Sequence, residues 1–146
     1  MNRERFFTCI MDICDWDKLG DDEQVLMPLI NHLSQLPDEE IFDFEDIMSE
    51  LLYELDTRKN YKTARKFYSH NDDTFLYSRC VALVNGEVYY EKVKAGKIKD
   101  LWKNEFESIL YVPREAWAKK HGKNMQDFPH ISPQSYETGS NTEAWK

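Results

Sequence analysis

Two groups of residues in this sequence have types and a spacing that could support binding or catalysis, and both groups contain acidic side chains. The first group recurs every three or four residues within a stretch of helical period, which places its members on one helix face. It consists of Glu39, Asp43, Asp46, Glu50 and Glu54, called the acidic stripe below. Like charges at this spacing repel one another. The stripe is therefore either a docking surface for a basic protein, or a solvated face that Arg58, Lys62 and Arg65 partly neutralise.

The second group is a candidate ligand corner, formed by Asp72, Asp73, Tyr77 and Arg79. A half-buried arginine favours the ionised form of a neighbouring aspartate, and such a pair suits the anchoring of a small ligand or substrate. The same residues also fit a structural role, in which the aspartates complement a helix dipole and the arginine completes a buried ion pair. Both interpretations remain open from the sequence.

Other kinds of site find no support in the residue spacing. The histidines His32, His70, His121 and His130 are scattered singly, and the chain contains neither an HExxH motif nor a Glu-x-x-His pair. No nucleophile elbow or glycine-rich phosphate loop is present. The sequence thus predicts no metal and no cofactor, and it gives no positive evidence for an enzyme.

Composition and charge narrow the classes of protein and partner. The 146 residues, 41% of them hydrophobic, suffice for one domain with a buried core. The net charge of −8 argues against nucleic-acid or anionic-membrane binding and favours a basic protein partner. Three cysteines, Cys9, Cys14 and Cys80, lie in apolar helical patterns and are expected to be reduced. Without a membrane span or a signal peptide, a cytoplasmic location is expected.

Helical periodicity predicts the elements that position these groups. The clearest element carries the acidic stripe and has a core face of Ile41, Phe44, Met48, Leu51 and Leu55. In the preceding helix, Asp21 and Asp22 predict an acidic N-cap, while Pro28 in the second turn suggests a later start near Met27. About seven helices are expected, at residues 3–17, 22–36, 38–56, 59–69, 72–86, 86–96 and 104–121, with a break or kink at Pro113.

The segment from Asp72 to Gly86 is expected to be the central helix, because its apolar residues point in nearly every direction. Only Thr74 and Ser78 are expected to face water. Arg79 must reach the surface along its aliphatic stem or find an acidic partner. Asn85 and Gly86 are expected to close the helix, with the glycine in a left-handed C-cap.

These elements predict an all-α fold, a single compact domain over residues 1–121. Periodicity is lost after Gly122, so residues 122–146 form a C-terminal tail. This tail either wraps the domain through Phe128, Ile131, Tyr136 and Trp145 or is loose.

The chain resembles DUF4240, a bacterial family of unknown function. The shared features are Phe6 to Ile10, the Leu36 to Phe44 helix entry, Asp72-Asp73 with Phe75, Arg79 and Gly86, and the segment from Glu107 to Trp117. The similarity covers about residues 5–121. This chain departs from the pattern at Thr74, where glycine is common, and at Val81, where tryptophan is common. The resemblance implies an all-helical fold and brings no known activity or catalytic residue.

The leading functional hypothesis is a small acidic protein that binds a basic protein partner, in its most concrete version an immunity or inhibitor-type protein. One alternative is a small-ligand binder or enzyme that uses the ligand corner. A third is a structural subunit of a homo-oligomer. Neither the partner nor the oligomeric state follows from the sequence.

Overall fold

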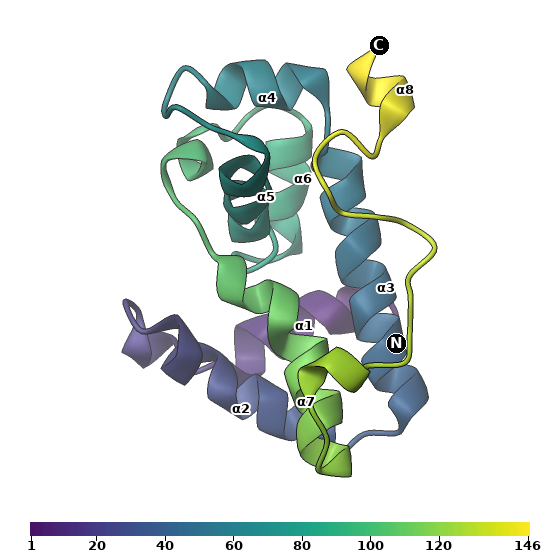
Figure 1. Cartoon of the computed structure of the whole chain (residues 1–146). Coiled ribbons are helices and arrows are strands. Elements are labelled where there is room, and N and C mark those ends of the chain that lie inside the picture. Colours follow the sequence, from purple (N-terminus) through teal and green to yellow (C-terminus); the bar gives the residue numbers. More distant parts are fainter. The chain divides into compact units, whose positions relative to one another are not determined.

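Every regular element of the protein is a helix, which confirms the predicted all-α fold (Figure 1). The computed structural model describes residues 1–146. Eight α-helices are accompanied by four short 3-10 helices: η1 (Trp16–Lys18), η2 (Asp100–Lys103), η3 (Glu107–Tyr111) and η4 (Met125–Asp127). The α-helices are α1 (Arg3–Ile13), α2 (Asp22–Ser34), α3 (Asp38–Leu55), α4 (Arg58–Ala64), α5 (Asp72–Val81), α6 (Glu87–Lys94), α7 (Val112–His121) and α8 (Thr142–Trp145).

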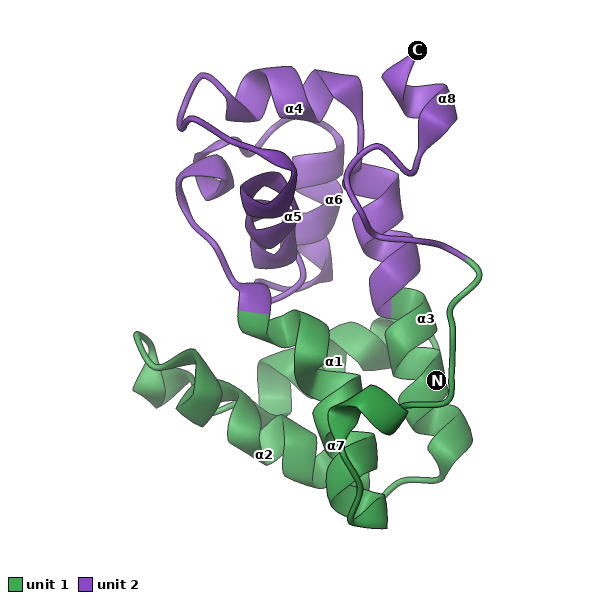
Figure 2. Ribbon diagram, viewed as in Figure 1, with its two compact units in different colours: residues 1–47, 108–133 green, residues 48–107, 134–146 purple.

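The residues group into two compact units (Figure 2). Unit 1 consists of Met1–Ile47 and Ser108–Pro133, and unit 2 of Met48–Glu107 and Gln134–Lys146. Helix α3 begins in unit 1 and ends in unit 2, so the two halves of the acidic stripe lie in different units.

In unit 1, α2 packs against α7 and α1 packs against α2. The rings of Phe6 on α1 and Phe44 on α3 lie 4.6 Å apart, and both side chains are fully buried. The predicted acidic N-cap at Asp21 and Asp22 is confirmed, whereas the later start near Met27 that Pro28 suggested is wrong. Helix α2 begins at Asp22, one turn and a half earlier, because the Asp21 side chain caps it by accepting a hydrogen bond from the Gln24 amide.

In unit 2, α5 is the buried helix, as predicted, but its polar residues are placed differently. Its Phe75 ring stacks on Trp102 of η2 (Asp100–Lys103) at 5.4 Å. The prediction that Ser78 faces water is wrong, because Ser78 is buried and its hydroxyl donates to the Asn104 carbonyl oxygen at 2.6 Å. This bond satisfies a polar group that would otherwise make burial unfavourable.

The end of α5 also differs from the prediction. The helix stops at Val81, and Gly86 is the N-cap of α6 instead of the C-cap of α5. Gly86 has a φ of 94°, which a residue with a side chain rarely adopts, so the glycine is needed here for the entry into α6.

The C-terminal tail contains the 3-10 helix η4 (Met125–Asp127) and helix α8. Phe128 is buried in unit 1 in a cluster with Ile41 and Trp117. Ile131, by contrast, is 90% exposed. Residues 134–146 belong to unit 2, where Trp145 packs against Tyr61 of α4 at a ring distance of 5.3 Å.

Candidate functional site

The first half of the acidic stripe is engaged within unit 1. Asp43 accepts a hydrogen bond from the amino group of Met1 at 2.7 Å, and this bond raises the pKa of that amino group. Asp46 Oδ1 lies 2.7 Å from Nε2 of His130 and accepts a hydrogen bond from the Ser132 hydroxyl at 2.5 Å. Glu39 is exposed. Two of these three carboxylates therefore already hold donors from other segments of the chain.

The second half of the stripe lies in unit 2. Glu54 Oε1 forms an ion pair with Lys94 of α6 at 2.7 Å and lies 3.5 Å from the Tyr90 hydroxyl. Glu50 is exposed on α3. The structure thus brings cations and hydroxyl groups to the stripe, and the stripe offers a partner much less free charge than the sequence suggested.

One acid of α3 that lies outside the stripe is the most deeply placed. The Glu45 side chain is 3% exposed, and its Oε2 atom has no hydrogen-bond partner. Burial raises the pKa of this carboxyl, and Arg114 of α7, with Nη2 3.6 Å from Oε1, opposes that increase. Helical spacing carries a signal for this burial, because Glu45 lies four residues after Ile41 and three before Met48, both on the core face of α3.

The four residues of the ligand corner do not converge on one point. Asp72 and Asp73 are exposed in the first turn of α5, where a capping box of Asn71 and Thr74 satisfies the free amide groups. Tyr77 is half-buried; burial raises its pKa, and nearby carboxylates raise it further. These carboxylates are, in decreasing order of effect, Glu107, Asp73, Glu137 and Glu105.

The Arg79 side chain donates to groups of unit 2 other than the carboxylates of Asp72 and Asp73. This side chain is fully buried, with Nη1 donating to the Leu52 carbonyl oxygen at 2.8 Å and Nη2 to the Thr138 hydroxyl at 3.0 Å. The guanidinium carbon lies 4.8 Å from the centre of the Phe75 ring. Burial lowers the pKa of Arg79, and the charge of Asp56 opposes that decrease. Its nearest acidic influence is thus Asp56, not Asp72 or Asp73.

A pocket of about 340 Å³ opens in unit 1, between α2 and the start of α7. Two carboxylates line it, the exposed Glu23 of α2 and the half-buried Glu115 of α7, and neither forms an ion pair with a cation of the chain. We call this the acidic pocket. Its other lining residues are apolar or weakly polar: Leu26, Met27, Ile30, Ser108 and Tyr111.

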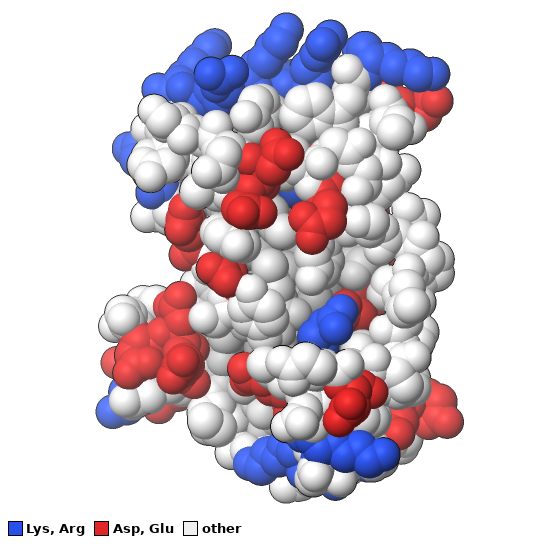
Figure 3. All heavy atoms as spheres, in the orientation of Figure 1, with Lys and Arg blue, Asp and Glu red and all other residues white.

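The electrostatics of the acidic pocket reflect this uncompensated charge. Burial raises the pKa of the Glu115 carboxyl, and the negative charge of Glu23 raises it further. Acidic side chains also gather over the start of α2 (Figure 3), where Asp15, Asp17, Asp21 and Asp22 precede Glu23. No local sequence pattern marks this pocket, because residues 23 and 115 are far apart in the chain.

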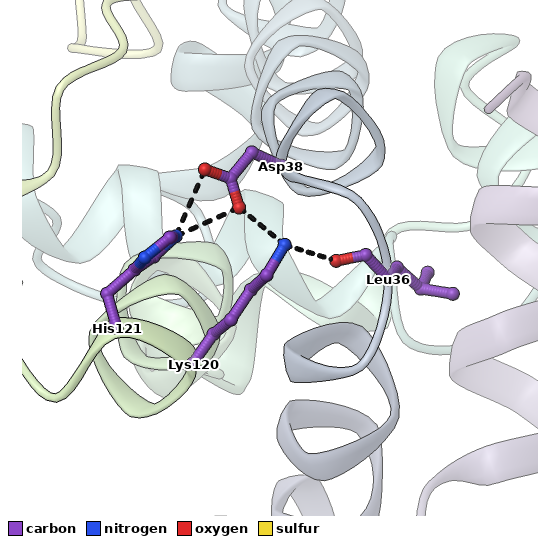
Figure 4. Close-up of polar contacts among 4 residues, drawn as sticks. All are labelled: Leu36, Asp38, Lys120 and His121. Atoms are coloured by element: carbon purple, nitrogen blue, oxygen red, sulfur yellow. Dashed lines mark hydrogen bonds and ion pairs between the residues drawn. The ribbon is translucent and has the colours of Figure 1, made fainter.

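The first residue of α3 and the last turn of α7 form a second charged cluster, in which the acidic side chain does have cationic partners (Figure 4). Asp38 Oδ1 lies 2.7 Å from Lys120 Nζ and 3.0 Å from His121 Nε2, and Lys120 also donates to the Leu36 carbonyl oxygen. The hydrogen bond from Lys120 lowers the pKa of Asp38, and His121 adds to this effect. The cluster joins two helix ends and leaves no group to hold a ligand.

No group of three or more histidine, cysteine or acidic side chains is arranged to hold a metal ion. Nor does any helix combine the length and apolar character needed to cross a membrane.

Comparison with known proteins identifies the family of the chain and gives no further similarity. A search of curated proteins and a search of solved structures each found no significant match. The model of a family described as a protein of unknown function, DUF4240, matches residues 1–119. Because this match covers most of the 146 residues, the chain belongs to the DUF4240 family.

Proposed function

We propose that this protein is an interaction module that binds a basic segment of another protein, and that the acidic pocket receives one lysine or arginine side chain of that partner. The observation that carries the proposal is the pair of carboxylates, Glu23 and Glu115, which line one pocket without a cation of the chain. Two like charges held together in this way are unfavourable unless a positive charge joins them.

The remaining walls of the pocket suit the stem of such a side chain. Lysine and arginine carry apolar stems that pack on apolar surface, and Leu26, Met27 and Ile30 provide that surface. Tyr111 offers an aromatic ring, which attracts cations over its face. Met27 is 49% exposed, and methionine and tyrosine are both enriched at protein interfaces.

The charge of the whole chain acts in the same direction. The net charge of −8 creates a field that accelerates the approach of a basic partner. The acidic stripe is a weaker candidate for the contact itself, because Asp43, Asp46 and Glu54 already hold donors of this chain.

The proposal can be tested with fluorescently labelled hexa-arginine and hexa-lysine peptides, with hexa-glutamate as the negative control. Binding is measured by fluorescence anisotropy to the wild type and to the double variant Glu23→Gln/Glu115→Gln. The matched control is Glu39→Gln/Glu50→Gln, which makes the same charge change in the acidic stripe. The pocket variant should weaken binding about fivefold, because Glu23 is exposed and Glu115 half-buried, and such partly exposed charge pairs contribute up to about 1 kcal/mol. The control variant should weaken binding much less.

The two double variants separate the possible outcomes. Loss of binding in the stripe variant but not in the pocket variant would place the contact on the stripe and overturn the proposed site. Equal binding of basic peptides to all three proteins, or no binding at 50 mM salt, would overturn the function as well. Binding that weakens with added salt agrees with it, because salt screens exposed charges.

A further inference from the structure

The C-terminal end of α3 carries a carboxylate whose hydrogen bonds all come from the tail. Asp56 is fully buried in unit 2. Its two oxygens accept hydrogen bonds from the amide groups of Gly139 at 3.0 and 3.1 Å and of Asn141 at 3.1 Å, and from the indole Nε1 of Trp145 at 2.9 Å. Residues 138–145 thus bind Asp56 much as a peptide ligand binds a receptor.

Further hydrogen bonds fix the position of the same segment. The Thr138 hydroxyl accepts a hydrogen bond from Arg79 Nη2 at 3.0 Å and donates to the Asp72 carbonyl oxygen at 2.7 Å. The Asn141 side-chain amide donates to the Tyr53 carbonyl oxygen at 3.1 Å. Main-chain and side-chain groups of the segment are therefore both recognised.

The aromatic end of the segment completes the contact. The indole ring of Trp145 lies 5.3 Å from the Tyr61 ring and 6.5 Å from the Phe75 ring, measured between ring centres. Trp145 remains half-exposed, as do most residues of the segment. We call the receiving residues, Tyr53, Asp56, Tyr61, Asp72, Phe75 and Arg79, the tail site.

The chemistry of the tail site requires an occupant. A buried carboxylate without hydrogen-bond donors is strongly unfavourable, and Asp56 has no donor to its side chain outside residues 139–145. The receiving residues all lie within residues 1–119, which match the family, whereas the segment lies outside that match. The domain therefore contains a built site for an added segment.

We propose that the tail site is a peptide-binding site for segments of the pattern Thr-Gly-x-Asn-x-x-x-Trp, occupied here by residues 138–145 of the same chain, and that it accepts this segment from a second copy. The segment lies on the surface of unit 2, and every copy of the protein carries both the site and its ligand. This interaction is separate from the acidic pocket, which lies in unit 1.

The test uses full-length proteins and a fluorescein-labelled synthetic peptide of residues 134–146. Trp145→Ala weakens the protein's own segment and leaves the tail site intact, so this variant should bind the labelled peptide. Wild type should bind it at least about tenfold more weakly, because the covalently linked segment competes at a high effective concentration. Adding Asp56→Asn to Trp145→Ala should reduce binding by a similar factor, since an amide donor then faces the peptide's own donors.

A labelled peptide in which Trp145 is replaced by alanine is the matched control and should bind poorly to every protein. Circular dichroism verifies that each variant is folded. If Trp145→Ala lowers the helix content, Asn141→Ala takes its place as the variant with a weakened segment. A folded variant that does not bind the peptide would overturn the proposal.

Exchange between copies has its own readout. Wild type refolded at about 1 mM should contain a dimer in which two copies exchange segments, and Trp145→Ala should contain far less. Size-exclusion chromatography with light scattering measures the dimer fraction. A wild type that remains entirely monomeric after refolding would refute the exchange between copies.

Discussion

Nζ of Lys120 lies 2.7 Å from Oδ1 of Asp38, and this ion pair joins the last turn of α7 to the first residue of α3 (Figure 4). Each charge also suits its own helix end. The aspartate lies where the helix dipole is positive, and the lysine where the dipole of α7 is negative. Both helices belong to unit 1, so this pair contributes directly to its stability.

Replacing Asp38 with asparagine should destabilise the protein at neutral pH by up to about 1 kcal/mol, a modest value because the pair is partly exposed and screened. Lys120, and to a lesser degree His121, lowers the pKa of Asp38 in the folded state. The ionised Asp38 carboxylate therefore stabilises the folded protein at pH values above the pKa of Asp38 in the unfolded chain, about 3.9. This stabilisation is lost as the pH falls through the lower pKa of the folded state. Thermal unfolding of Asp38→Asn and wild type from pH 7 to pH 3 should show the difference in stability begin to shrink below about pH 4 and decrease further toward pH 3.

The neighbouring substitution Glu39→Gln is the control for Asp38→Asn. It removes one negative charge from the same first turn, and its side chain is exposed. If both substitutions lowered stability equally and with the same pH dependence, the effect would come from the helix dipole and not from Lys120.

Much of the fold follows from the sequence because helical periodicity is a local signal. The predicted core face of α3, which includes Ile41, Phe44 and Met48, is fully buried, and the predicted boundaries of α3 are within one residue of those observed. Boundaries set by turns were less accurate. Helix α5 ends at Val81, five residues before its predicted end at Gly86. The prediction assigned Gly86 to the end of α5, whereas this glycine is the N-cap of α6.

The sites could not be derived in the same way, because they depend on contacts between distant parts of the chain. Asp46 and His130 are 84 residues apart, and no local pattern marks them as partners. Asp56 and Trp145 are separated by 89 residues. The sequence identifies α3 as acidic, but only the fold tells which of its carboxylates are already engaged.

Replacing Asp46 with alanine should destabilise unit 1, because it removes the acceptor of both His130 and Ser132. Hydrogen bonds to a charged group contribute about 1.5–3 kcal/mol, and we expect a loss of about 2 kcal/mol. The free energy of unfolding from urea titrations measures the effect. Glu39→Ala, in the same stripe, should change it by less than about 0.5 kcal/mol. Equal effects of the two substitutions would contradict the internal role of Asp46.

Glu115→Gln should stabilise the free protein at pH 7. Burial and the charge of Glu23 raise the pKa of this carboxyl, so its ionised form is less favourable in the folded than in the unfolded chain. The ionised Glu115 carboxylate therefore destabilises the folded protein at pH values above its folded pKa. This destabilisation disappears as the pH falls below the pKa of the unfolded chain, about 4.3. We therefore expect a higher melting temperature for Glu115→Gln at pH 7 and no difference near pH 3.5. A lower melting temperature at pH 7 would contradict the uncompensated charge of the acidic pocket.

The three cysteines should resist alkylation while the protein is folded. Cys9, Cys14 and Cys80 are buried and free, as predicted from their apolar surroundings. Burial raises the pKa of Cys14 and of Cys80 to about 12, and the thiolate is the reactive form. Mass spectrometry after treatment with iodoacetamide at pH 8 should show no modification of these two residues, and complete modification in guanidinium chloride. Rapid labelling of Cys80 in the native protein would indicate that α5 opens locally.

Arg79 is expected to be the costliest polar residue to remove. It is fully buried, and Arg79→Met deletes the donors to the Leu52 carbonyl oxygen and the Thr138 hydroxyl. Each hydrogen bond from a charged donor contributes about 1.5–3 kcal/mol, so urea unfolding followed by circular dichroism should show a loss of about 3–5 kcal/mol. Arg79→Lys should lose less, since it retains the charge but not the two-pronged geometry. Arg58→Met, at an exposed site on α4, controls for the loss of one positive charge. An Arg79→Met variant as stable as this control would mean that the residue is dispensable for the fold, and the ligand role considered from the sequence would then regain weight.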